Sequence, residues 1–72
     1  MKKVYYVIVD LDDLTYMTNG RGEKDIINAD KFESYIDARK ELEEYDKDFN
    51  GAIYEIIEHV DRQIKLIKKS GG

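Results

Sequence analysis

The first apolar stretch of the chain ends in three aspartates, Asp10, Asp12 and Asp13. Carboxylates at the end of a buried strand can act as a nucleophile or a general acid, and they can also bind a cation. The spacing of an EF-hand calcium loop is missing, so a cation site here would be weak. Aspartates are also common in turns, because their side chains accept hydrogen bonds from nearby backbone N–H groups. We favour this second role, a turn that closes the first strand.

The rest of the chain has few residues of the types that bind metals or act as catalysts. The chain has no cysteine and a single histidine, His59. Without cysteine there are no disulfides, no thiolate chemistry and none of the usual zinc sites, and one imidazole is too few for a transition-metal centre. His59 lacks a serine or cysteine partner pattern, so we interpret it as a surface imidazole on a strand. We expect no enzymatic activity, no cofactor and no metal site.

Residues 19–24, NGRGEK, form a glycine-rich segment with Arg21 as its cation. Loops that cradle phosphate lie between a strand and the start of a helix, whereas Glu23 and Asp25 follow here. Asn-Gly is a strong hairpin signal because both residues tolerate positive φ. We therefore predict a hairpin tip, with Arg21 and the nearby Tyr16 as candidate partner contacts.

Length and charge narrow the possible functions. The 72 residues predict one domain, 1–72, with a frayed tail over residues 70–72. A net charge of −4 argues against direct nucleic-acid binding, which needs a clustered cationic face. The N-terminal apolar run is broken at Asp10, and no small-residue cleavage site follows. We expect a cytoplasmic protein without membrane association.

Alternating β-branched and aromatic residues predict the strands. Residues 3–11, KVYYVIVDL, and residues 52–60, AIYEIIEHV, are apolar on both faces and should be central strands. Residues 14–18 predict a shorter strand, and a short return strand over residues 23–27 is a further option. Residues 63–69 have an edge-strand pattern in which lysines discourage unwanted pairing, and they follow a predicted tight turn at Asp61-Arg62.

Residues 34–51 carry both a start and a stop signal for a helix. Ser34 followed by Asp37 predicts an N-cap, and Asn50-Gly51 predicts the C-terminal stop. Between them an apolar stripe at helical spacing comprises Tyr35, Ala38, Leu42, Tyr45 and Phe49. The expected fold is α+β, a small, mostly antiparallel sheet of four or five strands (β-β-(β)-α-β-β) with one helix packed on one face.

An acidic row runs along the predicted helix at steps of four, three and four residues: Asp37, Glu41, Glu44 and Asp48. Charge is segregated, since residues 34–50 hold six acids and three bases while residues 62–69 hold four bases and no acid. Carboxylates on successive helical turns lie about 5–6 Å apart, similar to phosphates, and can enter a DNA-binding groove of another protein. The alternatives are a solvated face that keeps the protein soluble, or a contact with the basic tail of a second copy.

Both long strands are apolar on two faces, and a single helix can cover only one face of the sheet. The residues that we expect on the second face, as a self-association or target-binding surface, are Tyr5, Val7, Val9, Ile53 and Ile57. A homodimer is therefore possible. Alternatively, these side chains are exposed singly or lie under the loop of residues 19–31.

Residues 7–16, VIVDLDDLTY, resemble the first motif of the haloacid dehalogenase-like phosphatases. By that resemblance, Asp10 is the nucleophile and Asp12 the general acid. However, Leu14 stands where the family has a threonine, and Thr15 comes one place late. The later lysine and acidic motifs of the family also need a parallel α/β domain of more than twice this length. We therefore do not assign phosphatase activity.

Over nearly the whole chain, the pattern resembles small accessory proteins encoded by phages and prophages of low-GC Gram-positive bacteria. The segments that carry it are KKVYYVIVD, LTYMTNGRGE, ADKFESYIDARKEL and YEIIE. The resemblance implies a non-enzymatic protein that binds and inhibits a host enzyme or defence system. The alternative function is nucleotide binding at a site between copies, using Arg21, tyrosines and the lysines near Lys65.

Overall fold

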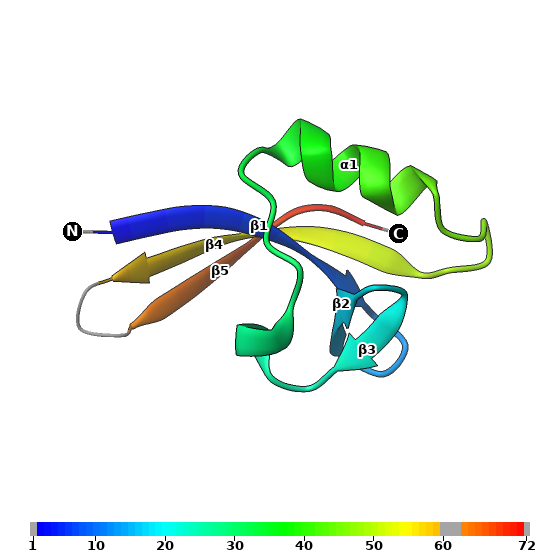
Figure 1. The fold of residues 1–72 in the computed structure, drawn as a ribbon, viewed down its shortest axis with the longest axis horizontal. Coiled ribbons are helices and arrows are strands. Elements are labelled where there is room, and N and C mark those ends of the chain that lie inside the picture. Colours follow the sequence, from blue (N-terminus) through cyan, green and yellow to red (C-terminus); the bar gives the residue numbers. More distant parts are fainter. Residues whose placement is uncertain (1, 60–62, 72) are drawn as a thin grey trace.

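One antiparallel sheet of five strands, ordered β3-β2-β1-β4-β5, forms the centre of the protein (Figure 1). It is seen in a computed structural model, which describes residues 2–59 and 63–71. One α-helix packs against the two middle strands, so the predicted α+β class and antiparallel sheet are confirmed. The strands are β1 (Lys2–Asp10), β2 (Thr15–Thr18), β3 (Arg21–Glu23), β4 (Gly51–His59) and β5 (Ile64–Gly71).

The two strands predicted to be central, β1 and β4, pair along their whole length, from Lys2 opposite His59 to Asp10 opposite Gly51. Residues directly opposite each other point to the same side of a sheet. Tyr5, Val7 and Val9 therefore share one face with Ile56, Tyr54 and Ala52. Tyr6 and Ile8 share the other face with Glu55 and Ile53. Apolar residues fill both sides, as expected for strands that are covered twice.

The helix α1 (Tyr35–Glu43) covers the face of Tyr6, which is called the helix face below. Its start is as predicted, because the Ser34 hydroxyl accepts a hydrogen bond from the Asp37 N–H at 3.2 Å. Ala38 is fully buried, and the rings of Tyr6 and Tyr35 meet edge to face with centroids 6.3 Å apart. These contacts fix α1 above the middle of the sheet (Figure 1).

The predicted end of the helix at Asn50-Gly51 is wrong, because α1 ends at Glu43 and Glu44 is its C-cap. A helix continued to Phe49 would run about 9 Å further at 1.5 Å per residue. It would carry Asn50 away from Leu11, whose N–H donates to the Asn50 carbonyl at 2.9 Å where β4 begins. Tyr45 and Phe49 instead pack together in the connecting loop, with ring centroids 4.6 Å apart.

The opposite side of the sheet, called the loop face below, is covered by the connection between β3 and α1. This connection contains a short 3-10 helix, η1 (Ile26–Asn28), with Asp25 as its N-cap. Its Ala29 joins the buried cluster formed by Tyr5, Val7, Val9 and Ile56. The possible return strand over residues 23–27 does not form there, because Glu23 is the last residue of β3 and Ile26 is the first of η1.

The hairpin between β2 and β3 has the predicted turn. Asn19 and Gly20 adopt φ angles of 49° and 78°, the left-handed values that an Asn-Gly turn of a tight hairpin requires. Thr18 lies opposite Arg21 across it. The turn is held by Asp30, which accepts hydrogen bonds from the Thr18 hydroxyl at 3.0 Å and the Asn19 N–H at 3.1 Å.

The end of the chain is more ordered than expected. Ser70 and Gly71 are not frayed but belong to β5, where they pair with Ile53 and Ala52 beyond an irregularity in the register. Gly72 and the predicted turn at Asp61-Arg62 lie outside the described residues, as does Val60, the last residue of the second predicted central strand.

Candidate partner-binding surface

The five residues predicted as a self-association surface do not form one exposed face. Tyr5, Val7 and Val9 are buried on the loop face, where the segment around η1 covers them. Ile53 is buried on the helix face, and Ile57 on the same face is half-buried. For the first three residues, the structure matches the alternative in which the loop of residues 19–31 covers them.

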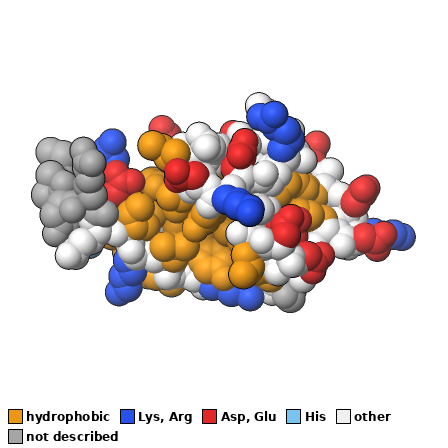
Figure 2. Space-filling view, turned by 90° about the horizontal axis from the view of Figure 1, so that it is seen from below, with side chains coloured by type: hydrophobic (Ala, Val, Ile, Leu, Met, Phe, Trp, Pro, Cys, Tyr) orange, Lys and Arg blue, Asp and Glu red, His pale blue; other side chains and the backbone are white. Residues whose placement is uncertain are grey.

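A different group of apolar side chains lies on the loop face, and we call it the apolar patch: Tyr5, Ile26, Ile27, Ile64 and Leu66. Tyr5 is buried at its centre and Ile26 is half-buried, whereas the other three are exposed. Ile27 is 71% exposed, Ile64 40% and Leu66 43%. Figure 2 shows hydrophobic side chains gathered across the middle of this side of the molecule, bordered by charged groups. Monomeric proteins seldom expose contiguous apolar surface without a use for it, so the patch is a candidate interface.

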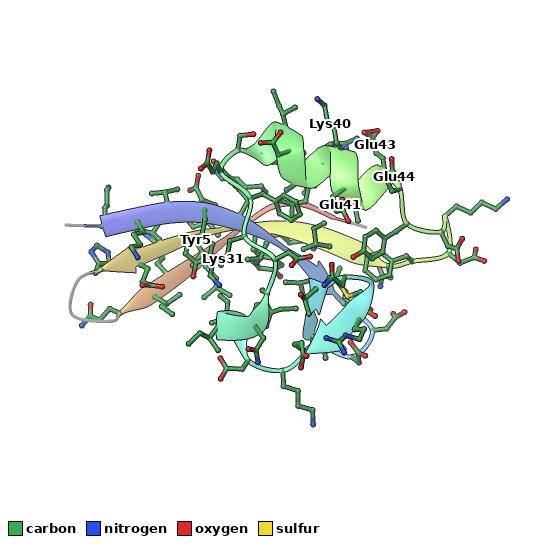
Figure 3. All side chains as sticks on the ribbon, in the orientation of Figure 1. Tyr5, Lys31, Lys40, Glu41, Glu43 and Glu44 are labelled. Carbon is green, nitrogen blue, oxygen red and sulfur yellow. The ribbon has the colours of Figure 1, made fainter. Side chains whose placement is uncertain are left out.

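A pocket of about 450 Å³ lies within the apolar patch, and we call it the Tyr5 pocket. Its lining is Tyr5, Asp25, Ile26, Ile27, Lys31, Glu58 and Ile64. The Tyr5 hydroxyl donates to Glu58 Oε1 at 3.3 Å, and Lys31 Nζ lies 5.6 Å from the centroid of the Tyr5 ring (Figure 3). The same amine donates to the Ile27 carbonyl at 3.1 Å. An apolar floor with polar groups at its rim suits an apolar side chain of a ligand.

The polar groups of the pocket are paired within the chain. Burial raises the pKa of Tyr5, and the charge of Glu58 and the hydrogen bond to it raise this pKa further. Its hydroxyl donates to Glu58. Lys31 is held over the ring by the carbonyls at the end of η1. These contacts fix the orientation of the Tyr5 hydroxyl and the Lys31 amine at the rim of the pocket.

Strand β5 borders the apolar patch and is the outermost strand on this side of the sheet. Ile64, Leu66 and Lys68 lie opposite Glu58, Ile56 and Tyr54, so their side chains are on the loop face. The strand carries three exposed lysines and no acid: Lys65, Lys68 and Lys69. It therefore combines an open backbone edge, exposed apolar side chains and positive charge.

The acidic row lies on the opposite side of the molecule from the apolar patch. Asp37, Glu41 and Glu44 are exposed on α1 and its C-cap, whereas Asp48 is in the loop that follows. Only two residues of the predicted row, Asp37 and Glu41, are thus within α1 itself, because the helix ends early. Figure 3 shows Lys40 and Glu43 on the outer side of α1 and Glu41 on the side nearer the sheet.

Part of the acidic row borders a second hollow of about 320 Å³ between α1 and the β2–β3 turn. Glu41 and Glu44 line it together with Asn19, Gly20 and Tyr45. Burial raises the pKa of Tyr45, and the charges of Glu41 and Asp30 add to the effect. The hollow is shallow and negatively charged.

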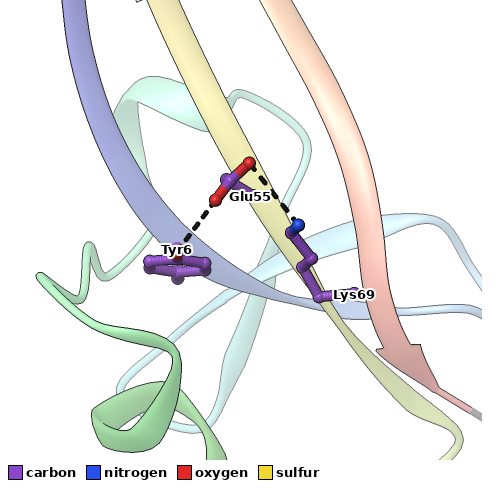
Figure 4. A network of polar contacts seen from close by, with 3 residues as sticks. All are labelled: Tyr6, Glu55 and Lys69. Atoms are coloured by element: carbon purple, nitrogen blue, oxygen red, sulfur yellow. Dashed lines mark hydrogen bonds and ion pairs between the residues drawn. The ribbon is translucent and has the colours of Figure 1, made fainter.

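On the helix face, a polar network ties the three strands β1, β4 and β5 together (Figure 4). The Tyr6 hydroxyl donates to Glu55 Oε2 at 2.8 Å, and Lys69 Nζ lies 3.8 Å from Glu55 Oε1. The hydrogen bond to Glu55 raises the pKa of Tyr6. Lys69 therefore already has an anionic partner within the chain.

The three aspartates at the end of β1 and in the turn after it act as turn residues in the structure. Asp10 Oδ1 accepts from the Asp12 N–H at 2.9 Å, and Asp13 Oδ1 accepts from the Thr15 hydroxyl at 2.6 Å. Asp12 accepts from the Asn50 side chain at 3.1 Å. Within residues 2–59 and 63–71, no group of three or more His, Asp or Glu side chains is placed to hold a metal ion.

The remaining candidate contacts lie far from β5. Arg21 is exposed on β3, while Tyr16 on β2 is half-buried and packs against the loop-face cluster. Arg21 and Lys65 are on strands at opposite edges of the sheet. A ligand site that uses both must therefore take them from two copies of the chain.

Comparison with protein-family models, with curated proteins and with solved structures found no match to this chain. Over the described ranges, no helix has the length and apolar character needed to span a bilayer. The sequence pattern indicates an edge strand over residues 63–69, but not that Ile27 and the pocket beside Tyr5 lie next to Ile64.

Proposed function

We propose that this protein is a non-enzymatic binding protein that contacts a partner protein through the apolar patch. The observation that carries the proposal is the placement of Ile27 and Ile64 at one pocket, beside an open strand edge that also carries Leu66. All three side chains are at least 40% exposed. Covering such side chains removes apolar area from water, the main driving force of most protein association.

The partner class follows from the whole-chain resemblance. On that basis the partner is a host enzyme or defence protein, and binding inhibits it. The acidic row is on the other side of the sheet, so a partner seated flat on the apolar patch does not reach it. We therefore place the main contact on the loop face and treat the acidic row as a separate surface.

The experiment compares two single substitutions that add the same charge on opposite sides of the molecule. Ile27→Lys lies in the apolar patch, and Ile36→Lys, at a position 65% exposed on α1, is the matched control. Each tagged variant and the unchanged protein capture partners from lysate of a Gram-positive host. We expect a stoichiometric partner that Ile27→Lys loses and Ile36→Lys retains.

A partner that is retained by Ile27→Lys would refute the apolar patch as the contact. The double substitution Glu41→Lys with Glu44→Lys then tests the acidic row directly, because both positions are exposed on the helix side. Light scattering of the purified protein is the third measurement and gives its oligomeric state. A dimer that Ile27→Lys converts to a monomer would show that a second copy covers the patch.

A further inference from the structure

The hydrogen-bonding pattern shows which backbone groups of β5 face the open edge. The His59 N–H donates to the Gln63 carbonyl at 2.8 Å, which makes residues 59 and 63 a hydrogen-bonded pair between β4 and β5. In an antiparallel ladder such pairs alternate with pairs that point away from each other. Lys65 and Ile67 therefore bond to β4, whereas the N–H and C=O groups of Ile64, Leu66 and Lys68 point outward.

The outward-facing backbone groups belong to the residues whose side chains lie on the loop face. A strand added to β5 would bond to the backbone of Ile64, Leu66 and Lys68 and would meet the side chains of Ile64 and Leu66 beside it. The Tyr5 pocket opens at the Ile64 end of this line. Backbone pairing and an apolar pocket thus occur along one edge, the combination used in recognition by strand addition.

Charge decides what kind of strand fits this edge. The exposed amines of Lys65 and Lys68 lie on the two sides of β5. A second copy pairing through its own β5 would place two sets of lysines on adjacent strands, and like charges on neighbouring strands are destabilising. Acidic side chains at these positions would be attracted instead.

We propose that the partner presents an extended, acidic segment that pairs with β5 as a sixth strand. Its apolar side chains pack on Ile64 and Leu66, with one entering the Tyr5 pocket, and its carboxylates lie beside Lys65 and Lys68. This inference rests on the proposed function, because it specifies how the partner uses the same surface.

The first test is selection of random 12-residue peptides, displayed on yeast, against the purified protein. We expect the enriched peptides to alternate apolar and acidic residues. Lys65→Glu combined with Lys68→Glu should weaken their binding about tenfold or more, since two attractive pairs become repulsive. Lys40→Glu combined with Lys47→Glu is the matched control, because it makes the same change in net charge at exposed positions away from β5.

The second test is amide hydrogen exchange of the free and peptide-bound protein. The Leu66 amide should exchange quickly in the free protein and at least tenfold more slowly in the complex. The Ile67 amide should be protected in both, because it is already paired with β4. Slower exchange of Leu66 on raising protein concentration, without peptide, would identify a second copy as the occupant and overturn the proposal.

The outcomes separate this inference from the proposed function. If bound peptides lose affinity with Ile27→Lys but neither β5 exchange nor Lys65→Glu with Lys68→Glu has an effect, strand addition is wrong and the apolar patch stands. Enriched peptides that are basic, or a selection that yields no peptide dependent on β5, also overturn strand addition. If Ile27→Lys affects neither the peptides nor the captured partner, both proposals fall.

Discussion

Tyr6 and Phe32 exchange two backbone hydrogen bonds, each with an N···O distance of 2.9 Å. This isolated bridge lies where the chain passes the edge of β1, between η1 on the loop face and α1 on the helix face. It allows a single connection to cover both faces of a small sheet. The loop of residues 19–31 thereby becomes part of the core.

Replacing Phe32 by proline removes the N–H that donates to the Tyr6 carbonyl. We expect Phe32→Pro to lower the free energy of unfolding by about 1–3 kcal/mol, the cost of leaving a backbone group unpaired. Urea denaturation followed by circular dichroism measures the change. Phe32→Leu keeps both hydrogen bonds and should lose less, so an equal loss would show that the ring, not the bridge, is what matters.

Gly20 in the β2–β3 turn has φ of 78° and no atom within 4 Å of the position that a side-chain carbon would take. Its substitution therefore tests backbone conformation alone. Gly20→Ala should destabilise the protein by about 1–2 kcal/mol, the cost of a left-handed conformation for an ordinary residue. Gly20→Asn should cost less because asparagine tolerates this conformation. Equal thermal midpoints for the two variants would contradict this account.

Ala38 is fully buried between α1 and the sheet. Ala38→Leu should reduce stability by about 1–3 kcal/mol, because a larger side chain forces the helix away from the strands. Lys40→Leu makes a comparable change in apolar character at an exposed position of the same helix and should stay within about 0.5 kcal/mol of the unchanged protein. The urea midpoints of both variants give the comparison. Similar losses of stability in the two variants would show that α1 does not contact the sheet through Ala38.

Tyr6 gives stability a defined dependence on alkaline pH. The hydrogen bond to Glu55 raises its pKa in the folded protein above the ordinary value of 10.0. Below pH 10 both states keep the proton and the contribution is complete, whereas above it the unfolded chain loses the proton first. Stability should therefore fall above about pH 10, and Tyr6→Phe should make this fall less steep.

Removing the Tyr35 hydroxyl should change the alkaline loss of stability in the opposite direction, so Tyr35→Phe serves as the control for Tyr6→Phe. Hydrogen bonds from the Ser70 hydroxyl and the Arg39 guanidinium lower its pKa, so its ionisation favours the folded state as pH rises towards 10. Tyr35→Phe should make the alkaline loss of stability steeper. Urea midpoints between pH 8 and pH 11 measure both slopes, and parallel curves for the two variants would contradict the assignment of these hydrogen bonds.

Local patterns were sufficient for β1, β2, β4 and most of β5, for the N-cap and for the tight hairpin, but not for the place of β3. The two central strands were recognisable because Val, Ile and Tyr continue on both faces of each, and Asn19-Gly20 can adopt φ angles that few other pairs tolerate. Ser34 was recognisable as an N-cap because its hydroxyl reaches a backbone N–H three residues on, within one turn. These features depend on neighbours in sequence.

Contacts between distant segments decided the rest. The end of α1 depends on the hydrogen bond between Leu11 and Asn50, and the cover of the loop face depends on the bridge between Tyr6 and Phe32. The apolar patch joins Tyr5, Ile27 and Ile64, which are far apart in the chain. Residue types and spacing alone determined the two central strands and the segregation of charge in this protein. Only the tertiary structure selected the buried faces and the open edge, because burial depends on which segments meet in space.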